Sequence, residues 1–169
     1  MEAALRPAFY EDLRVPDTKD ARLDMVILHV LLAVRALKDA GAQGPDPLGQ
    51  ALFDAMCEGL DAGYREEGFG DAKVARLVRG AAEQFYGRGR AYGAALDADD
   101  ADALASALAR NVYAGADVPP GGSRALASYV MRADRSLHAG SVRAGTLIFP
   151  STGPDEDHEH AEARDAAAS

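Results

Sequence analysis

The 169-residue chain has one cysteine, no tryptophan and few aromatic side chains, which make up 7% of its residues. A single cysteine, Cys57, excludes an internal disulfide, so we expect a reducing compartment. Valine, isoleucine, threonine and aromatic residues are too sparse and scattered for a fold dominated by β-sheet. The sequence therefore lacks both a disulfide framework and the usual material of a sheet.

Long apolar segments are also missing. The longest, residues 25–34, is interrupted by His29 and is far shorter than the roughly 20 residues of a membrane-spanning helix. Residues 1–10 contain an acid and a proline but no apolar segment of their own, so no secretory signal is expected. We predict a soluble, cytoplasmic protein, with peripheral membrane association as the alternative.

Basic residues are fewer than acidic ones: the chain has 18 Lys and Arg and 27 Asp and Glu, which gives a net charge of −9 at pH 7. This balance argues against wrapping a nucleic-acid backbone over a large surface. Residues 151–169 carry six acids and one arginine, and we predict a disordered acidic tail there. Residues 1–150 are expected to form one domain, since a chain of that length can bury a hydrophobic core without disulfides or structural metal ions.

Alanine is abundant, with 36 of the 169 residues, and it has the highest intrinsic helix propensity. Apolar residues at helical spacing make residues 18–40 the expected central helix. We predict an all-α fold, a single compact bundle of about six helices that ends in a short extended segment. The expected helices cover residues 2–13 (bent at Pro7), 18–40, 47–64, 71–96, 99–113 and 123–137, and the extended segment covers residues 145–150.

Several positions favour helix N-caps, where a side-chain oxygen accepts from a free backbone N–H. Asp17 or Thr18 is expected to cap the central helix, Asp71 the fourth helix and Ser123 the sixth. Asp, Glu and His at 155–160 are candidate metal ligands, but such a segment is more often simply solvated. The aspartates at 97–102 resemble magnesium-binding clusters, yet capping and the helix dipole account for them without a metal.

The remaining candidates are accounted for by structural roles. Cys57 has no basic neighbour in sequence, so an inert thiol is expected. His29 is a conceivable haem ligand, but a single histidine on a core helix is more often held by hydrogen bonds. Gly87, Gly89 and Gly93 interrupt a helical pattern, which predicts close packing of another helix or a kink; a packing role, at another helix or at a partner interface, is favoured. No catalytic triad, phosphate-binding loop or zinc spacing is present.

Three groups of residues occur in a characteristic order. They are residues 7–10 with 15–18, 22–25 and 28–30; residues 61–71, which include Tyr64-Arg65-Glu66 and Gly68-Phe69-Gly70-Asp71; and residues 85–92 followed by 108–113. This ordered set, closed by residues 145–150, resembles the ubiquinol–cytochrome c chaperone family, assembly factors of respiratory complex III. The resemblance covers about residues 7–150. The family more often has leucine at the position of Tyr64, and the acidic tail lies outside the resemblance.

The resemblance implies a non-enzymatic chaperone without a cofactor, whose client is newly made cytochrome b during haem insertion and early assembly. It also suggests a small partner chaperone subunit and the ribosome as partners. For a bacterial member it suggests a place at the inner face of the cytoplasmic membrane. An acidic stripe of Asp54, Glu58 and Asp61 is a candidate for binding basic loops of the client.

Polar residues that match the family pattern and are not required by the core stripes are the candidate partner-binding set. They are Arg22, Asp24, His29, Asp61, Arg65, Glu66, Asp71, Tyr86, Gly87, Arg88 and Tyr92. Alternatively, Arg65, Glu66 and Asp71 only form ion pairs and caps around the turn at residues 68–70. Two other functions stay open, a helical adaptor unrelated to respiration and a helical enzyme that uses Asp99, Asp100 and Asp102 with magnesium.

Overall fold

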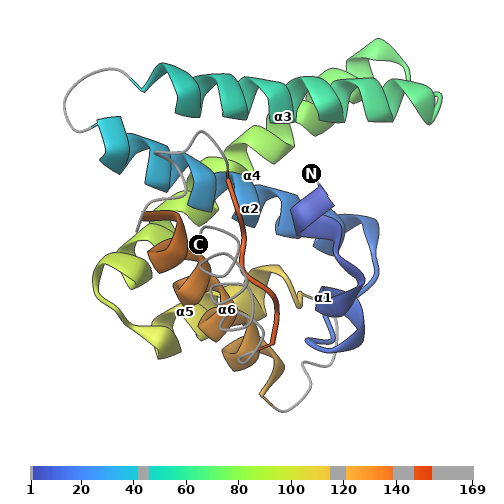
Figure 1. Cartoon of the computed structure of the whole chain (residues 1–169). Helices are drawn as coiled ribbons and strands as arrows, with labels where there is room; N and C mark the ends of the chain where they lie inside the picture. The colour runs from blue at the N-terminus through green and yellow to red at the C-terminus, as the bar shows by residue number, and fades with distance from the viewer. Residues whose placement is uncertain (1, 42–45, 115–120, 139–146, 154–169) are drawn as a thin grey trace, which may run out of the picture.

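The computed structural model describes residues 2–41, 46–114, 121–138 and 147–153, and within them all regular secondary structure is helical. A short 3-10 helix, η1, precedes six α-helices (Figure 1). The elements in chain order are η1 (Glu2–Leu5), α1 (Pro7–Glu11), α2 (Lys19–Gly41), α3 (Pro47–Glu66), α4 (Asp71–Asp97), α5 (Ala101–Asn111) and α6 (Gly122–Ser136). The predicted all-α fold is confirmed.

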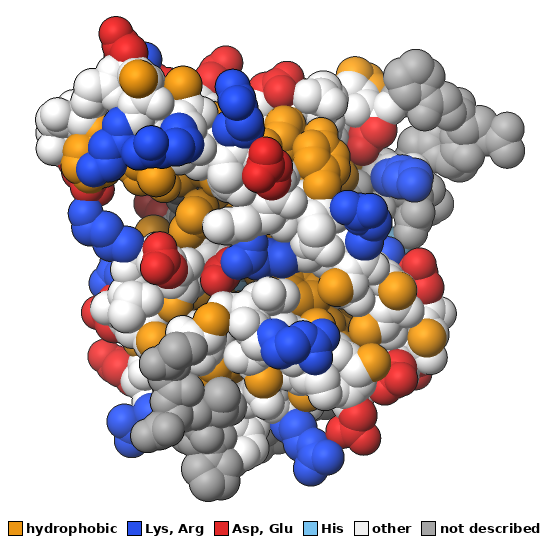
Figure 2. All heavy atoms as spheres, turned by 180° about the vertical axis from the view of Figure 1, so that it is seen from behind, with side chains coloured by type: hydrophobic (Ala, Val, Ile, Leu, Met, Phe, Trp, Pro, Cys, Tyr) orange, Lys and Arg blue, Asp and Glu red, His pale blue; other side chains and the backbone are white. Residues whose placement is uncertain are grey.

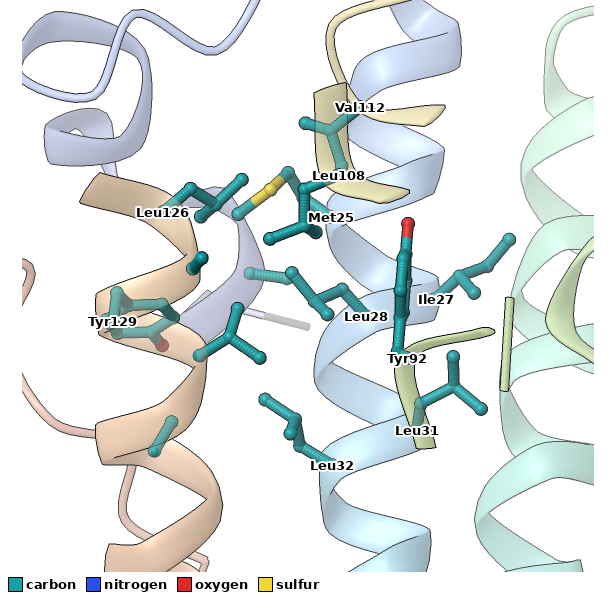
Figure 3. Close-up of a cluster of buried hydrophobic side chains, with 14 of the residues drawn as sticks. Met25, Ile27, Leu28, Leu31, Leu32, Tyr92, Leu108, Val112, Leu126 and Tyr129 are labelled. Carbon is teal, nitrogen blue, oxygen red and sulfur yellow. The ribbon is translucent and has the colours of Figure 1, made fainter. Parts of the chain in front are cut away.

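Helix α2 is the central element, as its apolar pattern predicts. It packs against η1, α3, α4 and α6. Figure 3 shows Met25, Leu28 and Leu32 on the side of α2 that faces α6, where Leu126 and Tyr129 project toward them; all five are buried. On another side of α2, the buried side chains of Ile27 and Leu31 lie near Tyr92 of α4 (Figure 3). Leucine-rich surfaces on two sides explain why this helix is almost fully enclosed.

Two helical hairpins surround α2. Helices α3 and α4 are joined by residues 67–70; α3 lies across one end of the bundle, and α4 runs from there behind α2 to the other end, where α5 packs on α6 (Figure 1). The turn between α3 and α4 contains Gly68 at a φ of +84°, a left-handed conformation that glycine adopts without steric cost. The α4 helix is long enough to contact α2, α3 and α5.

The helix starts follow the predictions only in part. Thr18 Oγ1 accepts from the Ala21 N–H at 3.2 Å, so threonine rather than Asp17 provides this contact before α2. Asp71 is the first residue of α4 and Gly70 precedes it as an N-cap without a side-chain hydrogen bond. Helix α6 starts at Gly122 after Gly121 in a left-handed conformation, which leaves Ser123 inside the helix rather than at the predicted cap.

After α6, residues 147–153 run across the bundle between the N-terminal segment and α6, and we call them the C-terminal strap (Figure 1). Arg6 donates to the carbonyl oxygens of Phe149 and Pro150 at 3.2 and 2.7 Å. Arg132 donates to the carbonyl oxygens of residues 151–153 at 3.2 to 3.5 Å. Residues 151–153, the predicted start of the tail, are thus held against α6, and the rest of the tail, 154–169, lies outside the described residues.

None of the described helices is long and apolar enough to cross a membrane.

Candidate functional site

Three of the predicted site residues meet in a buried polar network between helices. Asp24 of α2 forms an ion pair with Arg88 of α4, and their side chains are only 6% and 13% exposed. Tyr92, one turn after Arg88, is buried and accepts from Asn111 Nδ2 of α5 at 3.1 Å. The Arg88 Nε has no hydrogen-bond partner within the described residues. The network therefore ties α2, α4 and α5 together at a substantial desolvation cost.

The electrostatics of this network follow from its burial. Burial raises the pKa of Asp24 to about 6, although the Arg88 guanidinium opposes the shift by favouring the carboxylate. Burial also raises the pKa of Tyr92 to about 12, so its hydroxyl is protonated at neutral pH. A charged pair held in this way fixes how two helices cross and is inaccessible to direct contact with a large partner.

A second group of predicted residues lies at the turn between α3 and α4. Arg65 Nε donates to Asp61 Oδ1 at 2.5 Å, and another guanidinium nitrogen of Arg65 contacts Asp71 across the turn. These hydrogen bonds raise the pKa of Arg65. The side chains are 40% to 89% exposed, so solvent screens the pairs. Glu66 is exposed beside them. The arrangement fits the structural alternative, in which ion pairs hold the turn.

Arg22 stands apart from both groups. Its Nε donates to Asp17 Oδ1 at 2.6 Å, and its guanidinium lies over the Tyr10 ring at 5.3 Å from the centroid. The hydrogen bond from Arg22 lowers the pKa of Asp17. Arg22 therefore links the start of α2 to α1 at the surface, although it lies only two residues before the buried Asp24.

Tyr86 and Gly87 occupy the exposed face of α4. Tyr86 is 57% exposed and packs against Phe53 of α3, with 5.5 Å between ring centroids. A Cβ at Gly87 meets nothing within 4 Å, so the predicted packing of a neighbouring helix is wrong at this position. It is correct at Gly89, where a Cβ lies 3.0 Å from Leu31 Cδ2. At Gly93 the nearest atom belongs to Arg35, at 3.6 Å, which is an ordinary contact.

His29 is the centre of a buried aromatic cluster. Its Nδ1 lies 2.8 Å from the Met25 carbonyl oxygen and its Nε2 lies 2.8 Å from the Tyr129 hydroxyl oxygen. Because a carbonyl oxygen only accepts, Nδ1 carries the proton and Nε2 accepts from Tyr129. The rings of Phe9 and Phe149 lie 5.3 and 4.8 Å from the imidazole. Both nitrogens are engaged, so the histidine is held by hydrogen bonds as expected and offers no lone pair to a haem iron.

Burial lowers the pKa of His29 to about 4, so the imidazole is neutral at physiological pH. The nearby positive charge of Arg6 acts in the same direction, while the hydrogen bond to Met25 opposes it. A neutral histidine with satisfied nitrogens presents mostly ring carbon to its surroundings. This makes it a suitable wall for an apolar pocket.

Such a pocket lies beside His29 and has a volume of about 360 Å³. Its walls are mostly apolar and come from η1, α2, α3 and the C-terminal strap. They are Glu2, Ala3, Ala4, Val26, His29, Val30, Ala33, Leu52, Leu147 and Phe149. Of these, only His29 belongs to the predicted site. The pocket was not predicted from the sequence. Its sequence signal is the hydrophobic run 147–149, which predicts an extended segment that ends the fold but not a pocket beside it.

Large hydrophobic side chains are exposed on the elements that form this pocket. Leu48, at the start of α3, is 64% exposed, and Leu147 and Ile148 of the strap are 36% and 41% exposed. We call Leu48, Leu147 and Ile148 together with the pocket the apolar surface. On α3 the predicted acidic stripe is present, with Asp54 and Glu58 exposed. The same hairpin helix thus carries apolar and acidic groups.

The aspartates around the start of α5 act as a cap and as ion-pair partners. Asp100 Oδ1 accepts from the Ala103 N–H at 2.9 Å, which confirms capping at α5. Asp99 and Asp102 pair with Arg135 and Arg124 at 2.7 and 3.1 Å. Within the ranges that the structure describes, no three His, Cys, Asp or Glu side chains are grouped as metal ligands. The candidate metal ligands at 155–160 lie outside these ranges.

Cys57 is partly buried on α3. Burial raises the pKa of its thiol and the nearby Asp54 adds to the shift, so the reactive thiolate is disfavoured at neutral pH. This environment agrees with the expected inert thiol.

Comparison with known proteins gives two matches. The family model described as ubiquinol–cytochrome C chaperone matches residues 11–144. The chain is also similar to a solved structure, the Cbp3 homolog from Brucella abortus, with 36% sequence identity and a TM-score of 0.73. That similarity covers 89% of this chain and 83% of the other. No curated protein matches the chain.

Proposed function

The chain belongs to the ubiquinol–cytochrome c chaperone family, and from this premise we propose that it is a non-enzymatic assembly chaperone of respiratory complex III. Its client is newly made cytochrome b, which it holds during haem insertion and early assembly. It acts at the inner face of the cytoplasmic membrane, with a small partner chaperone subunit and the ribosome as further partners.

The observation that carries the proposal is the apolar surface. A membrane protein that has not yet assembled presents apolar helices and needs a partner that covers them. An apolar pocket of about 360 Å³ that Leu147 helps to line, on elements that also carry the exposed Leu48 and Ile148, fits a few large side chains of such a helix. This supports binding of an apolar client segment by the strap, η1 and α3.

The acidic stripe on α3 supports the same client. Cytoplasmic loops of membrane proteins carry an excess of lysine and arginine. Asp54 and Glu58 are exposed on α3, the helix that also supplies Leu48 and Leu52 to the apolar surface. Asp54 lies on a different side of α3 from Leu52, so a basic loop that adjoins the bound segment would pass around this helix to reach the acids, which favours correct orientation more than affinity.

The buried polar groups support binding rather than catalysis. Asp24 and His29, whose pKa values are strongly shifted, are enclosed by Arg88 and by Met25 and Tyr129, respectively. Shifted pKa values occur in structural networks as well as in active sites. Here each shifted group already has a partner that occupies it.

The test is complementation of a deletion strain, with assembled complex III and its b-type haem measured in isolated membranes. The wild type is expected to restore both. The double variant Leu147→Asp/Ile148→Asp is expected to fail, because two charges would be placed on the apolar surface. The matched control Ala103→Asp/Ala125→Asp adds the same charge at exposed positions on α5 and α6 and is expected to restore assembly.

Circular dichroism and thermal melting of both variants establish that each is folded. If deletion leaves complex III unchanged, the adaptor function unrelated to respiration is the correct one. If deletion lowers complex III but the strap variant restores it fully, the chaperone function stands and the apolar surface is wrong.

A further inference from the structure

The solvent face of α4 carries a row of cations in a protein that is otherwise acidic. Arg76, Arg79 and Arg90 are all exposed, and Tyr86 lies between them. The spacings of 3, 7 and 4 residues place these four side chains on one face of a helix. From the first to the last, the row extends about 21 Å along the helix axis. We call these four residues the arginine row.

The three arginines have no ion-pair partner within the part of the chain that the structure describes. By contrast, Arg35, Arg65 and Arg88 are each paired with aspartate. Glu83 lies within the arginine row and is exposed, but it forms no ion pair with the row. Unpaired cations gathered on one helix face produce a local positive potential that the net charge of −9 conceals.

Tyr86 gives the row an amphipathic centre. It is 57% exposed, yet its ring packs on Phe53 and Phe85, each with 5.5 Å between centroids. Tyrosine with one supported apolar side and a polar hydroxyl is enriched at membrane interfaces. Figure 2, which views the molecule from behind, shows Lys and Arg side chains near exposed hydrophobic side chains on this side, with Asp and Glu side chains among them.

We propose that the arginine row of α4 is a docking surface for an anionic lipid bilayer. Arginines in one row on a helix face can meet a plane together, and their apolar stems can lie along the surface while the guanidinium groups contact lipid phosphates. The supported ring of Tyr86 then reaches the interfacial region. The arginine row would be the surface that holds the protein at its proposed membrane location, and to that extent the inference rests on the proposed function. It does not depend on client binding, because lipid binding needs no client.

A membrane is favoured over a nucleic acid by the shape of the charged surface. The positive groups form one narrow row on the solvent face of one helix. A nucleic acid that wraps around the protein needs a broader basic surface with several phosphate contacts. A flat bilayer needs only the row.

Co-sedimentation with lipid vesicles tests the proposal on the full-length protein. Vesicles of 30% phosphatidylglycerol in phosphatidylcholine are compared with pure phosphatidylcholine at 0.1 M salt. Each basic residue at an anionic surface strengthens binding roughly fivefold, so Arg76→Gln/Arg79→Gln/Arg90→Gln is expected to weaken binding roughly 100-fold.

The matched control is Arg14→Gln/Lys38→Gln/Arg110→Gln. It removes three exposed cations that have no ion pair among the described residues and lie outside α4, so it changes net charge equally. Its binding is expected to stay within about threefold of the wild type. Thermal melting of both triple variants establishes that each is folded.

The proposal is overturned if the wild type does not sediment with the anionic vesicles, or if both triple variants lose binding equally. A single-stranded RNA 20-mer is titrated in parallel. Binding of the RNA, but not the vesicles, through Arg76, Arg79 and Arg90 would assign the row to nucleic acid instead. Self-association of the wild type that the α4 variant abolishes, without vesicle binding, would assign it to a second copy. Complementation by the strap variants is unaffected by any of these outcomes.

Discussion

Replacing Arg88 with methionine is expected to destabilise the fold strongly and in a pH-dependent way. The substitution keeps an unbranched side chain of moderate size but leaves Asp24, 5% exposed, without its cation. Removing one partner of a buried ion pair costs about 3 to 5 kcal/mol. We expect this full cost at pH 7.5, where wild-type Asp24 is ionised.

The pH dependence follows from the pKa of Asp24, which is about 6 in the folded chain against an ordinary value of 3.8. Because burial favours the neutral carboxyl, Asp24 contributes most to the free energy of unfolding below about pH 4. This contribution is lost as the pH rises through 6, a change of roughly 3 kcal/mol. Arg88 holds that pKa down, so its loss raises the pKa further. Above pH 6, the deficit of Arg88→Met therefore grows by up to about 1.4 kcal/mol per pH unit.

Urea unfolding at pH 5, 6, 7, 7.5 and 8 measures this directly. The control is Arg124→Met, because the Arg124–Asp102 pair is 75% and 80% exposed and is expected to contribute less than about 1 kcal/mol at any of these pH values. A deficit of Arg88→Met below about 1 kcal/mol at pH 7.5, or one that does not change with pH, would refute the account of this network.

Two further predictions concern α2 and α4. The pKa of His29 is about 4, below its ordinary 6.5, so the contribution of His29 lowers the free energy of unfolding as the pH falls from 6.5 to 4. The contribution of Asp24, whose pKa is raised to about 6, increases the free energy of unfolding as the pH falls over this range. Urea unfolding of His29→Gln should therefore show stability that rises on acidification over this range, and a fall would contradict the assignment. Gly87→Ala should raise the free energy of unfolding by up to about 1 kcal/mol, since its Cβ meets open space. Gly89→Ala should gain less, because its Cβ lies 3.0 Å from Leu31, and equal gains would contradict the packing.

Much of the fold was predictable because it depends on local composition and periodicity. Alanine-rich segments with apolar residues at helical spacing fold as helices, and the enclosed α2 has the most continuous apolar pattern. Helix starts were less predictable. Thr18 and Asp100 have oxygens placed to accept, whereas before α4 and α6 the chain uses Gly70 and Gly121, whose role depends on backbone conformation.

The site was predictable only as a set of residues, and not as an arrangement. Asp24, Arg88 and Tyr92 belong together because α2 and α4 cross at one particular place, and no local pattern encodes that crossing. Gly87 and Gly89 have the same sequence signature, yet one faces solvent and the other faces Leu31. Positions two residues apart on a helix point to nearly opposite sides, and which side faces α2 depends on how the helices pack.

The apolar surface escaped sequence reasoning for a related reason. Residues 147–149 form a short hydrophobic run, which indicates burial but does not say against what. Its position depends on Arg6 and Arg132, which hold the strap from two sides through its carbonyl oxygens. Long-range hydrogen bonds to backbone atoms leave no trace in the identity of the residues that accept them.

Photo-crosslinking in growing cells tests directly whether cytochrome b binds at the apolar surface. A benzophenone amino acid is placed at position 148 of the strap, with position 103 on α5 as the exposed control. A covalent adduct with cytochrome b is expected from position 148 and none from position 103. Adducts from position 148 that contain other proteins but no cytochrome b, in cells that are making complex III, would contradict it.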